Sequence, residues 1–480
     1  MRWRIVLVVL LSLLVPGLSG ASAEERVSLR AVSGSPNGPD AYWPRDGNGG
    51  TNALRYNIHV TYDFRSRKLW GRTVATMRAQ EALSSFHLDL LLPVSRVRVN
   101  GRAARFSKPT PHELRVVPAT AIAKGTTFKV DVTYAGYPGR ASYAGERNWL
   151  ADGQEVVAMN QPHMAPWWFP SNDHPTDKAQ FEVRVTVPRA KRVVSNGTLI
   201  DRTVNGTRAT THWRATDPMA TYLAFFAAGG YAVETGRSAA GIRYYNAVST
   251  QLPPAARSAA MAQLRRTGAV TDWLAGQFGT YPFTSTGGLV TGLDVGFALE
   301  NQTRPTYGAW IYPSVVVHEL AHQWFGDSVS VRRWRDIWLN EGFASYAEWA
   351  FDEAHGGTST AARLGSTYRA WCDAPTADFW TLDLTSPGAA HIFDEPVYER
   401  GAMVLAALKK RIGTTNLRNL LRAWAAAHHD GNATVAQFEA LAASYGGGQD
   451  LGGFFDAWLR DGTVPAATAD NGLAGVTCPS

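Results

Sequence analysis

The stretch VVVHELAHQWFGD, Val315 to Asp327, places two histidines and a glutamate within a short apolar run. His318 and His322 are four residues apart, so on a helix their side chains lie about 40° apart on one face and can reach one metal ion. Glu319 projects roughly 100° around the helix from His318, which puts it beside the ion rather than on it. A carboxylate at that place can take a proton from metal-bound water.

A helix is expected here because Pro313 suits a first turn and the run to Phe325 has no internal Gly or Pro. The HExxH pattern alone also fits two core histidines on an apolar helix. Nineteen residues after His322, Glu341 lies in WLNEGFASYAEW, whose apolar and small residues suit a second helix. A carboxylate as third ligand leaves the fourth position of a tetrahedral zinc open for water, as in catalytic sites. The two histidines disfavour hard-oxygen metals, so zinc is the leading candidate.

The length and residue pattern predict two domains. The chain has 480 residues, of which 45% are hydrophobic and 18% charged, the balance of a folded protein. From 52 to 233, apolar and polar residues alternate, as in RYNIHVTY and FEVRVTVP, which predicts a β-sheet domain. From 234 to 465 helical periodicity dominates; one helix is expected through ARSAAMAQLRRTGAVTDWLAGQFG, with Ala260, Met261 and Leu264 on its apolar stripe. The fold class is therefore α+β.

Residues 1–23 are expected to be a secretory signal peptide. Two arginines precede an apolar run that Pro16 and Gly17 interrupt, and the sequence ASA fits a cleavage site after Ala23. An uncleaved membrane anchor is the alternative, which the shortness of the run disfavours. The mature protein is therefore predicted to be secreted, without stable insertion into a membrane.

The charge pattern gives no indication of a nucleic-acid partner. The formal net charge of +7 falls to +5 without residues 1–23, because two arginines and no acid are removed. Lys and Arg are interspersed with acids rather than gathered into a run, a pattern that favours solubility over nucleic-acid binding.

Two cysteines, Cys372 and Cys478, are the only ones in the chain. In an exported protein two cysteines most simply form one disulfide, and two free thiols are the alternative. The disulfide would tie the C-terminal tail, 466–480, to the helical domain. At the other end, 24–51 is a Gly/Pro-rich lead before the first expected strand.

HELAHQWFG followed by NEGFA, with eighteen residues between His322 and Glu341, resembles the M1 family of zinc aminopeptidases. The resemblance extends to WFPSNDHPTDKAQFEV at 168–183, to FGTYPF near the start of the helical half and to VYERGAMVL. It implies an N-terminal saddle of β-sheets followed by a mostly helical, thermolysin-like zinc peptidase domain.

The resemblance also implies roles for single residues. His318, His322 and Glu341 would bind one zinc ion per chain, and Glu319 would be the general base. Tyr398, in PVYERG, matches the family tyrosine that stabilises the oxyanion opposite the zinc; a lone tyrosine in a helix would otherwise more often belong to the core. The implied reaction is removal of N-terminal amino acids from peptides with a free N-terminus, by a zinc-activated water.

The family's exopeptidase motif, usually Gly-x-Met-Glu-Asn, appears here as FALEN at 297–301. Glu300 and Asn301 are kept, so a carboxylate that can bind the substrate's α-ammonium remains, with an ordinary surface acid as the alternative. Phe297 replaces the glycine and adds bulk beside the first side-chain pocket. Gln161 resembles the family's second amine-binding residue.

Other features leave alternatives open. Glu348, seven residues after Glu341, would share its helix face and could hold a zinc-ligand histidine by a hydrogen bond, or could be a solvated surface residue. The large C-terminal helical domain of many family members is not seen, which predicts a more open cleft. The changed motif and this cleft keep a zinc endopeptidase or broad peptidase in view. A catalytically inactive peptide-binding protein is the alternative from another class, and the oligomeric state is not predicted.

Overall fold

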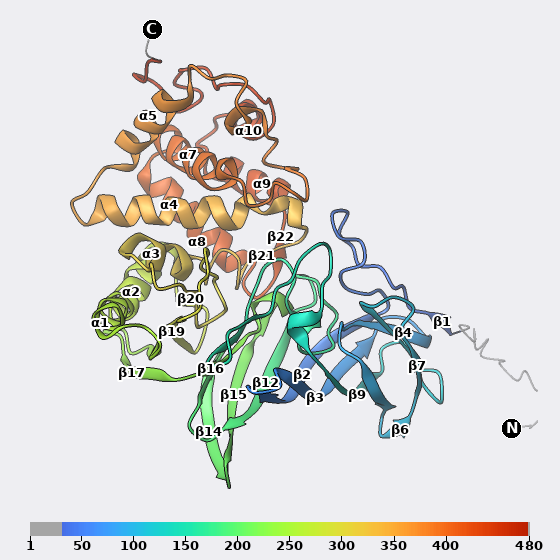
Figure 1. Ribbon diagram of the computed structural model, residues 1–480. Coiled ribbons are helices and arrows are strands. Elements are labelled where there is room, and N and C mark those ends of the chain that lie inside the picture. Colours follow the sequence, from blue (N-terminus) through green and yellow to red (C-terminus); the bar gives the residue numbers. More distant parts are fainter. Residues whose placement is uncertain (1–30, 479–480) are drawn as a thin grey trace, which may run out of the picture. The chain divides into compact units, whose positions relative to one another are not determined.

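The computed structural model describes residues 31–478 (Figure 1). From residue 31 onward the chain forms one compact unit. The expected signal peptide, residues 1–23, lies outside the described residues. Within 31–478, no helix is long and apolar enough to cross a membrane.

The largest sheet has the strand order β14-β15-β12-β2-β3-β9-β5-β6. Its central strand β2 alternates as expected: Tyr56, Ile58 and Val60 are buried on one face. The parallel pairing of β12 with β2 sets Val60 opposite Val185, so apolar residues of neighbouring strands share that face. The strands are β2 (Thr51–Asp63), β3 (Lys68–Ala79), β5 (Val94–Val99), β6 (Arg102–Ala103), β9 (Thr127–Gly136), β12 (Ala179–Pro188), β14 (Thr198–Asn205) and β15 (Arg208–Met219).

Two smaller sheets complete the first half of the chain, with the orders β1-β4-β8-β7 and β10-β11-β16-β13. Aromatic rings fill the space beside them: the ring of Trp168 lies 4.6 Å from that of Phe169 and 5.3 Å from that of Phe226. The strands are β1 (Val32–Ser33), β4 (Leu83–Asp89), β7 (Arg105–Ser107), β8 (Glu113–Val117), β10 (Leu150–Ala151), β11 (Val156–Ala158), β13 (Arg192–Ser195) and β16 (Phe226–Gly229).

The second half begins with a four-stranded sheet of order β17-β18-β19-β20 and continues with helices. The first strand, β17 (Tyr231–Arg237), crosses the expected boundary at residue 233, and β18 (Arg243–Ser249) follows it. The other strands are β19 (Ser285–Val290), β20 (Thr306–Tyr307), β21 (Ser330–Val331) and β22 (Asn432–Ala433). The helices are α1 (Pro254–Leu264), α2 (Thr267–Phe278), α3 (Pro313–Ala321), α4 (Trp338–Ala354), α5 (Thr360–Trp371), α6 (Asp378–Thr381), α7 (Glu395–Ile412), α8 (Thr414–Ala427), α9 (Val435–Tyr445) and α10 (Gly452–Leu459).

One expected helix is in fact two. The chain turns at Arg265 and Arg266, where the Arg266 N–H donates to the Gln263 carbonyl at 3.0 Å, so α1 and α2 are separate. After the turn, Gly268 lies against Ser238, whose Cβ would be 3.2 Å from a Cβ atom at this glycine. The prediction of a single helix was wrong because its stripe of apolar residues does not show where the axis turns.

The helices α4 and α7 approach each other closely at two glycines. A Cβ atom on Gly342 would lie 2.8 Å from the Cα of Gly401, closer than side chains allow. Glu341 precedes Gly342 in the chain, and Tyr398 lies almost one turn before Gly401. This crossing therefore brings two expected site residues to one place, as Figure 1 shows for the two helices.

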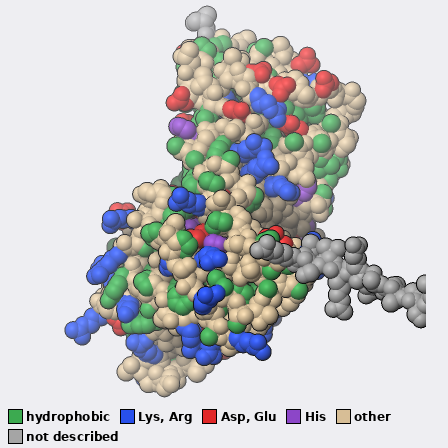
Figure 2. Space-filling model, turned by 90° about the vertical axis from the view of Figure 1, so that its right-hand side faces the viewer, with side chains coloured by type: hydrophobic (Ala, Val, Ile, Leu, Met, Phe, Trp, Pro, Cys, Tyr) green, Lys and Arg blue, Asp and Glu red, His purple; other side chains and the backbone are tan. Residues whose placement is uncertain are grey.

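The C-terminal tail is joined to the helical half by a disulfide between Cys372, at the end of α5, and Cys478. On the face drawn in Figure 2, Lys and Arg side chains are scattered among other residues. The predicted α+β order, a sheet-rich first half followed by a mostly helical second half, is confirmed.

Candidate active site

The helix α3 carries His318 and Glu319 of the candidate site, and His322 follows its last residue directly. It ends at Ala321, although the run without Gly or Pro continues to Phe325. His322 nevertheless keeps helical backbone angles, and its N–H donates to the His318 carbonyl at 3.2 Å. The two imidazole rings therefore stay one turn apart, with centroids separated by 4.8 Å. After His322 the chain leaves the helix and enters a loop. Gly326 lies in this loop with a φ of 137°, a backbone angle that glycine adopts readily.

Each histidine is held through its outer ring nitrogen. His318 Nδ1 lies 2.8 Å from Glu348 Oε1, and His322 Nδ1 lies 2.9 Å from the carbonyl oxygen of Phe325. Such contacts fix the ring orientation and leave each Nε2 free to bind a metal. Glu348, which the sequence left open between two roles, therefore contacts a histidine.

Glu341 supplies the third donor from α4. Its Oε2 lies 3.4 Å from His318 Nε2 and 3.3 Å from His322 Nε2. One ligand atom from each of the three residues lies within 4.8 Å of the others, and all three side chains are buried. Two imidazole nitrogens and one carboxylate oxygen are the donor set of catalytic zinc sites, so these residues fit a zinc ion.

The charges of the site favour proton transfer at Glu319. Burial raises the pKa of Glu319 to about 8, although both histidines act to lower it. Burial also acts to raise the pKa of Glu341, but His322 and His318 lower it to about 2. A carboxyl group with a pKa near neutrality can both accept and return a proton. The pKa values of the two glutamates are therefore shifted in opposite directions although both side chains lie in the same cavity.

One cavity of about 280 Å³ brings most of the expected site residues together. Tyr398, on α7, faces His318 with ring centroids 6.0 Å apart. Phe297, the residue that replaces the family glycine, is 37% exposed and also lines the cavity. The lining residues are Gln161, Phe297, Ala298, Glu300, Tyr312, Val315, His318, Glu319, His322, Glu341, Ser345, Glu348, Tyr398 and Glu399.

Glu300 and Gln161 meet at the side of this cavity. Gln161 Nε2 donates to Glu300 Oε1 at 3.1 Å, and a Glu300 oxygen lies within 4.8 Å of donor atoms of Glu319 and His322. Asn301, which was also expected to bind substrate, is not among the residues that line the cavity. Its buried amide donates to the Leu223 carbonyl at 3.0 Å, so it positions the loop that carries Glu300.

Two residues of this region were missed in the sequence. The Tyr222 hydroxyl donates to Glu300 Oε1 at 3.2 Å, and no motif marks this tyrosine. Gln323 donates to the Glu300 carbonyl at 3.0 Å and accepts from the Thr303 N–H at 2.7 Å. Its place directly after His322, with a buried polar side chain, was a signal that could have been used.

This site defines a class of protein, the zinc peptidases that use a HExxH helix with a distant glutamate. Residues 52–223 match the family description "Peptidase M1 N-terminal domain", and residues 286–458 match "Peptidase family M1 domain". The chain belongs to peptidase family M1. The resemblance seen in the sequence is therefore confirmed.

Relatives and solved structures agree with this assignment. The chain is 25% identical to a leucyl aminopeptidase of Saccharolobus solfataricus over 76% of this chain and 48% of the relative. It is 24% identical to an aminopeptidase N of Lactococcus lactis over 86% of this chain and 51% of the relative. The chain thus spans about half the length of these relatives.

Among solved structures, an M1 zinc metallopeptidase from Deinococcus radiodurans superposes with a TM-score of 0.79 and 26% identity. That similarity covers 89% of this chain and 98% of the other. A mutant of the Deinococcus radiodurans enzyme bound to a Tyr-Ser-Ala substrate superposes with a TM-score of 0.78.

Proposed function

We propose that this protein is a zinc aminopeptidase that removes N-terminal amino acids from peptides. The observation that carries the proposal is the placement of Glu300, with Gln161 and Tyr222 as partners, beside the zinc-type donor set. A carboxylate at this distance from the reacting centre can hold a substrate's α-ammonium so that only the first peptide bond reaches Glu319.

The proposed metal ligands are His318, His322 and Glu341, with one zinc ion per chain. When bound, zinc would polarise the scissile carbonyl and lower the pKa of water. Glu319 then takes a proton from the attacking water at its carboxylate and returns it to the leaving amine. Burial, which raises the pKa of this carboxyl group, favours its holding the proton until the amine leaves.

Glu300 selects the free N-terminus. It is 2% exposed, and burial raises its pKa, so a nearby positive charge is needed to favour the carboxylate form. A substrate ammonium supplies that charge, whereas an acetylated N-terminus supplies none and leaves the buried carboxylate without a positive partner. This difference supports exopeptidase over endopeptidase action, the alternative that the FALEN motif raised.

Tyr398 is proposed to stabilise the oxyanion. The centroid of its ring lies 6.0 Å from that of His318. Its hydroxyl is a neutral donor, because burial raises its pKa well above the ordinary value. A placed donor of this kind is commonly worth about 3 kcal/mol in the transition state.

The same proposal includes secretion. Residues 1–23 are taken as the signal peptide, 52–233 as the N-terminal domain and 234–465 as the catalytic domain. N-terminal sequencing of the exported protein tests the first point, since cleavage after Ala23 leaves Glu24 as the first residue.

The test is release of a fluorophore from free and N-acetylated aminoacyl substrates, with zinc content measured on the same samples. Wild type is expected to cut only the free-amine substrate, and Glu319→Gln to keep zinc but lose activity. Glu234→Gln, the same chemical change at an exposed surface pair with Arg265, is the control. Equal cleavage of acetylated substrates would establish an endopeptidase, and a zinc-loaded wild type that cuts nothing would leave a peptide-binding protein.

A further inference from the structure

A second cavity, of about 640 Å³, lies where strands β14 and β15 meet strands β17 and β18. Its walls include Leu199, Trp213 and Tyr245, and its cations are Arg237, Arg243 and Arg304. None of its lining residues lines the zinc cavity. We call it the arginine pocket.

Two of its arginines face each other across a sheet ladder. Arg237 of β17 is paired in register with Arg243 of β18. Like charges directly opposite in an antiparallel pair repel each other and destabilise the ladder. No carboxylate among residues 31–478 forms a salt bridge with either one, and Glu234, three residues before Arg237, is already paired with Arg265 at 2.6 Å.

Arg304 adds a third cation and is only 1% exposed. Its guanidinium donates to the carbonyl oxygens of Tyr245, Thr286 and Gly197 at 2.7, 2.6 and 2.9 Å. These acceptors carry no charge, and the Arg304 Nε has no hydrogen-bond partner among the described residues. A buried cation is ordinarily paired with an acid, so the pocket holds an uncompensated positive charge.

The walls suit a flat apolar group. The rings of Trp213 and Tyr245 lie edge to face, 5.0 Å apart at 85°, and Arg304 lies over both. Leu199 is 40% exposed beside them. Planar guanidinium groups bind carboxylates in a bidentate manner, and aromatic walls bind a ring.

We propose that the arginine pocket binds a small aromatic carboxylate. The carboxylate lies between Arg237 and Arg243 and relieves their repulsion, while the ring lies against Leu199 and Tyr245. Trp213 is only 1% exposed and packs against Tyr245. This inference does not depend on the peptidase activity.

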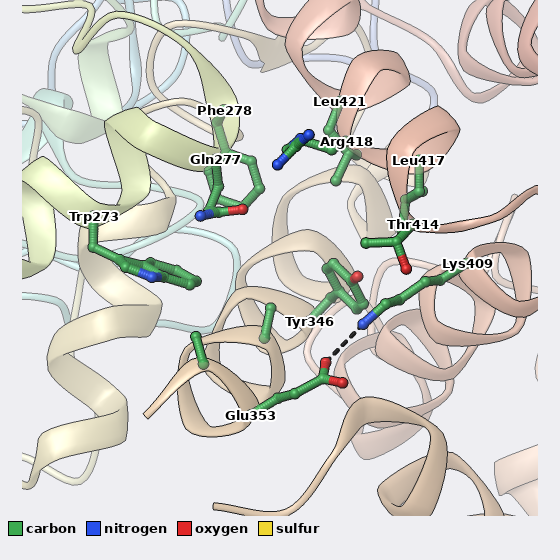
Figure 3. Close-up of a pocket in the computed structure, with 12 residues that line it drawn as sticks. Trp273, Gln277, Phe278, Tyr346, Glu353, Lys409, Thr414, Leu417, Arg418 and Leu421 are labelled. Carbon is green, nitrogen blue, oxygen red and sulfur yellow. Dashed lines mark hydrogen bonds and ion pairs between the residues drawn. The ribbon is translucent and has the colours of Figure 1, made fainter. Parts of the chain in front are cut away.

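The cavity in Figure 3 differs from the arginine pocket in the charge of its lining. That cavity, of about 320 Å³, also has aromatic walls, including Trp273 and Tyr346. There, however, Lys409 Nζ lies 2.7 Å from Glu353 Oε2, so the lining carries both signs of charge. Of these two cavities, only the arginine pocket combines arginines and aromatic walls with a lining that contains no acid.

The test is calorimetric titration of the zinc-loaded full chain with phenylacetate and with phenylacetamide, which has the same shape without the charge. We expect phenylacetate to bind at least tenfold more tightly than phenylacetamide. Arg237→Gln and Arg243→Gln should each weaken phenylacetate binding at least tenfold, and Arg98→Gln, on β5, should leave it unchanged. Circular dichroism of each variant shows whether it is folded.

Three outcomes would overturn the inference. Equal binding of the amide would show that the arginines do not select an anion. Phenylacetate binding that survives Arg243→Gln but disappears on metal removal would place the ligand at the zinc site instead. An absence of binding to folded wild type would rule out this ligand class.

Discussion

Two buried groups in this protein each combine histidine and carboxylate side chains. His318, His322 and Glu341 form one, in the helical half. Asp89 forms the other with His112 and Glu113, in the sheet-rich half. In each group the possible ligand atoms lie within 4.8 Å of one another. Composition and proximity alone would suggest a metal at both.

The two groups differ in what their remaining atoms contact. In the helical half, the Nδ1 atoms of both histidines form hydrogen bonds, and their Nε2 atoms face Glu341. In the sheet-rich half, Asp89 accepts from the N–H groups of Gly47 at 3.1 Å and Asp173 at 2.8 Å, and from the Asn48 amide at 3.1 Å. A carboxylate with these donors already stabilises the loops around it. We therefore expect a metal at the group in the helical half and not at the one whose Asp89 already accepts three hydrogen bonds.

Removal of one histidine from each group has the largest expected effect. His318→Ala is expected to lose zinc and to lower activity at least about a thousandfold, because metal catalysis supplies several kcal/mol. His112→Ala should keep one zinc ion per chain and its activity. Zinc content by atomic emission and peptide hydrolysis measure both. Two zinc ions in wild type, falling to one in His112→Ala, would contradict the comparison.

The sheet-rich group lies beside a charged pair whose strength depends on pH. His163 Nε2 lies 2.6 Å from Asp46 Oδ2, and its Nδ1 lies 3.1 Å from Glu146. Burial acts to lower the pKa of His163, but Asp46 and Glu146 raise it to about 10. Because the folded pKa lies above the unfolded value of about 6.5, the stability from this pairing is full below pH 6.5 and is lost as the pH rises toward 10.

His163→Gln is therefore expected to cost about 3 kcal/mol of unfolding free energy at pH 6.5, with the difference from wild type shrinking toward pH 9.5. Urea unfolding at both pH values measures it. His391→Gln, in a half-exposed pair with Asp394, is the control and should change little. A difference that grows with pH would show that His163 is neutral in the folded protein.

Asp89→Asn tests whether the sheet-rich group is structural. It is expected to lower the unfolding free energy by about 2 kcal/mol, because one amide oxygen cannot accept all the bonds that two carboxylate oxygens do. Zinc content should not change. Asp470→Asn, at a side chain that is 90% exposed, serves as the control. Loss of bound metal in folded Asp89→Asn would show that Asp89 is a ligand.

Glu348→Gln gives the smallest expected effect. The amide oxygen still accepts from His318 Nδ1 but without a charge, so zinc affinity should fall about tenfold. Competition with a chelating dye measures the affinity. Glu353→Gln, on the same helix but paired with Lys409, should leave it unchanged. An unchanged affinity in Glu348→Gln would mean that holding the ring does not matter here.

Some features of the fold could be predicted and others could not. The alternation in β2 predicted its buried face because successive strand residues point to opposite sides. The turn at Arg265 and the end of α3 at Ala321 were not predicted, because a periodic pattern shows which face of a helix is buried and not where the helix ends. The contact of Asn301 with the Leu223 carbonyl was not predicted, because Leu223 lies far away in the sequence.

The sequence alone determined the local geometry of the site: the spacing of His318 and His322 puts both rings on one helix face, because a turn takes 3.6 residues. Only the tertiary structure decided which distant residues join them. Gln161 and Tyr222 come from the first half of the chain to contact Glu300, and the close crossing at Gly342 brings Tyr398 near His318. Such contacts depend on how whole elements pack, so no short stretch of the sequence contains them.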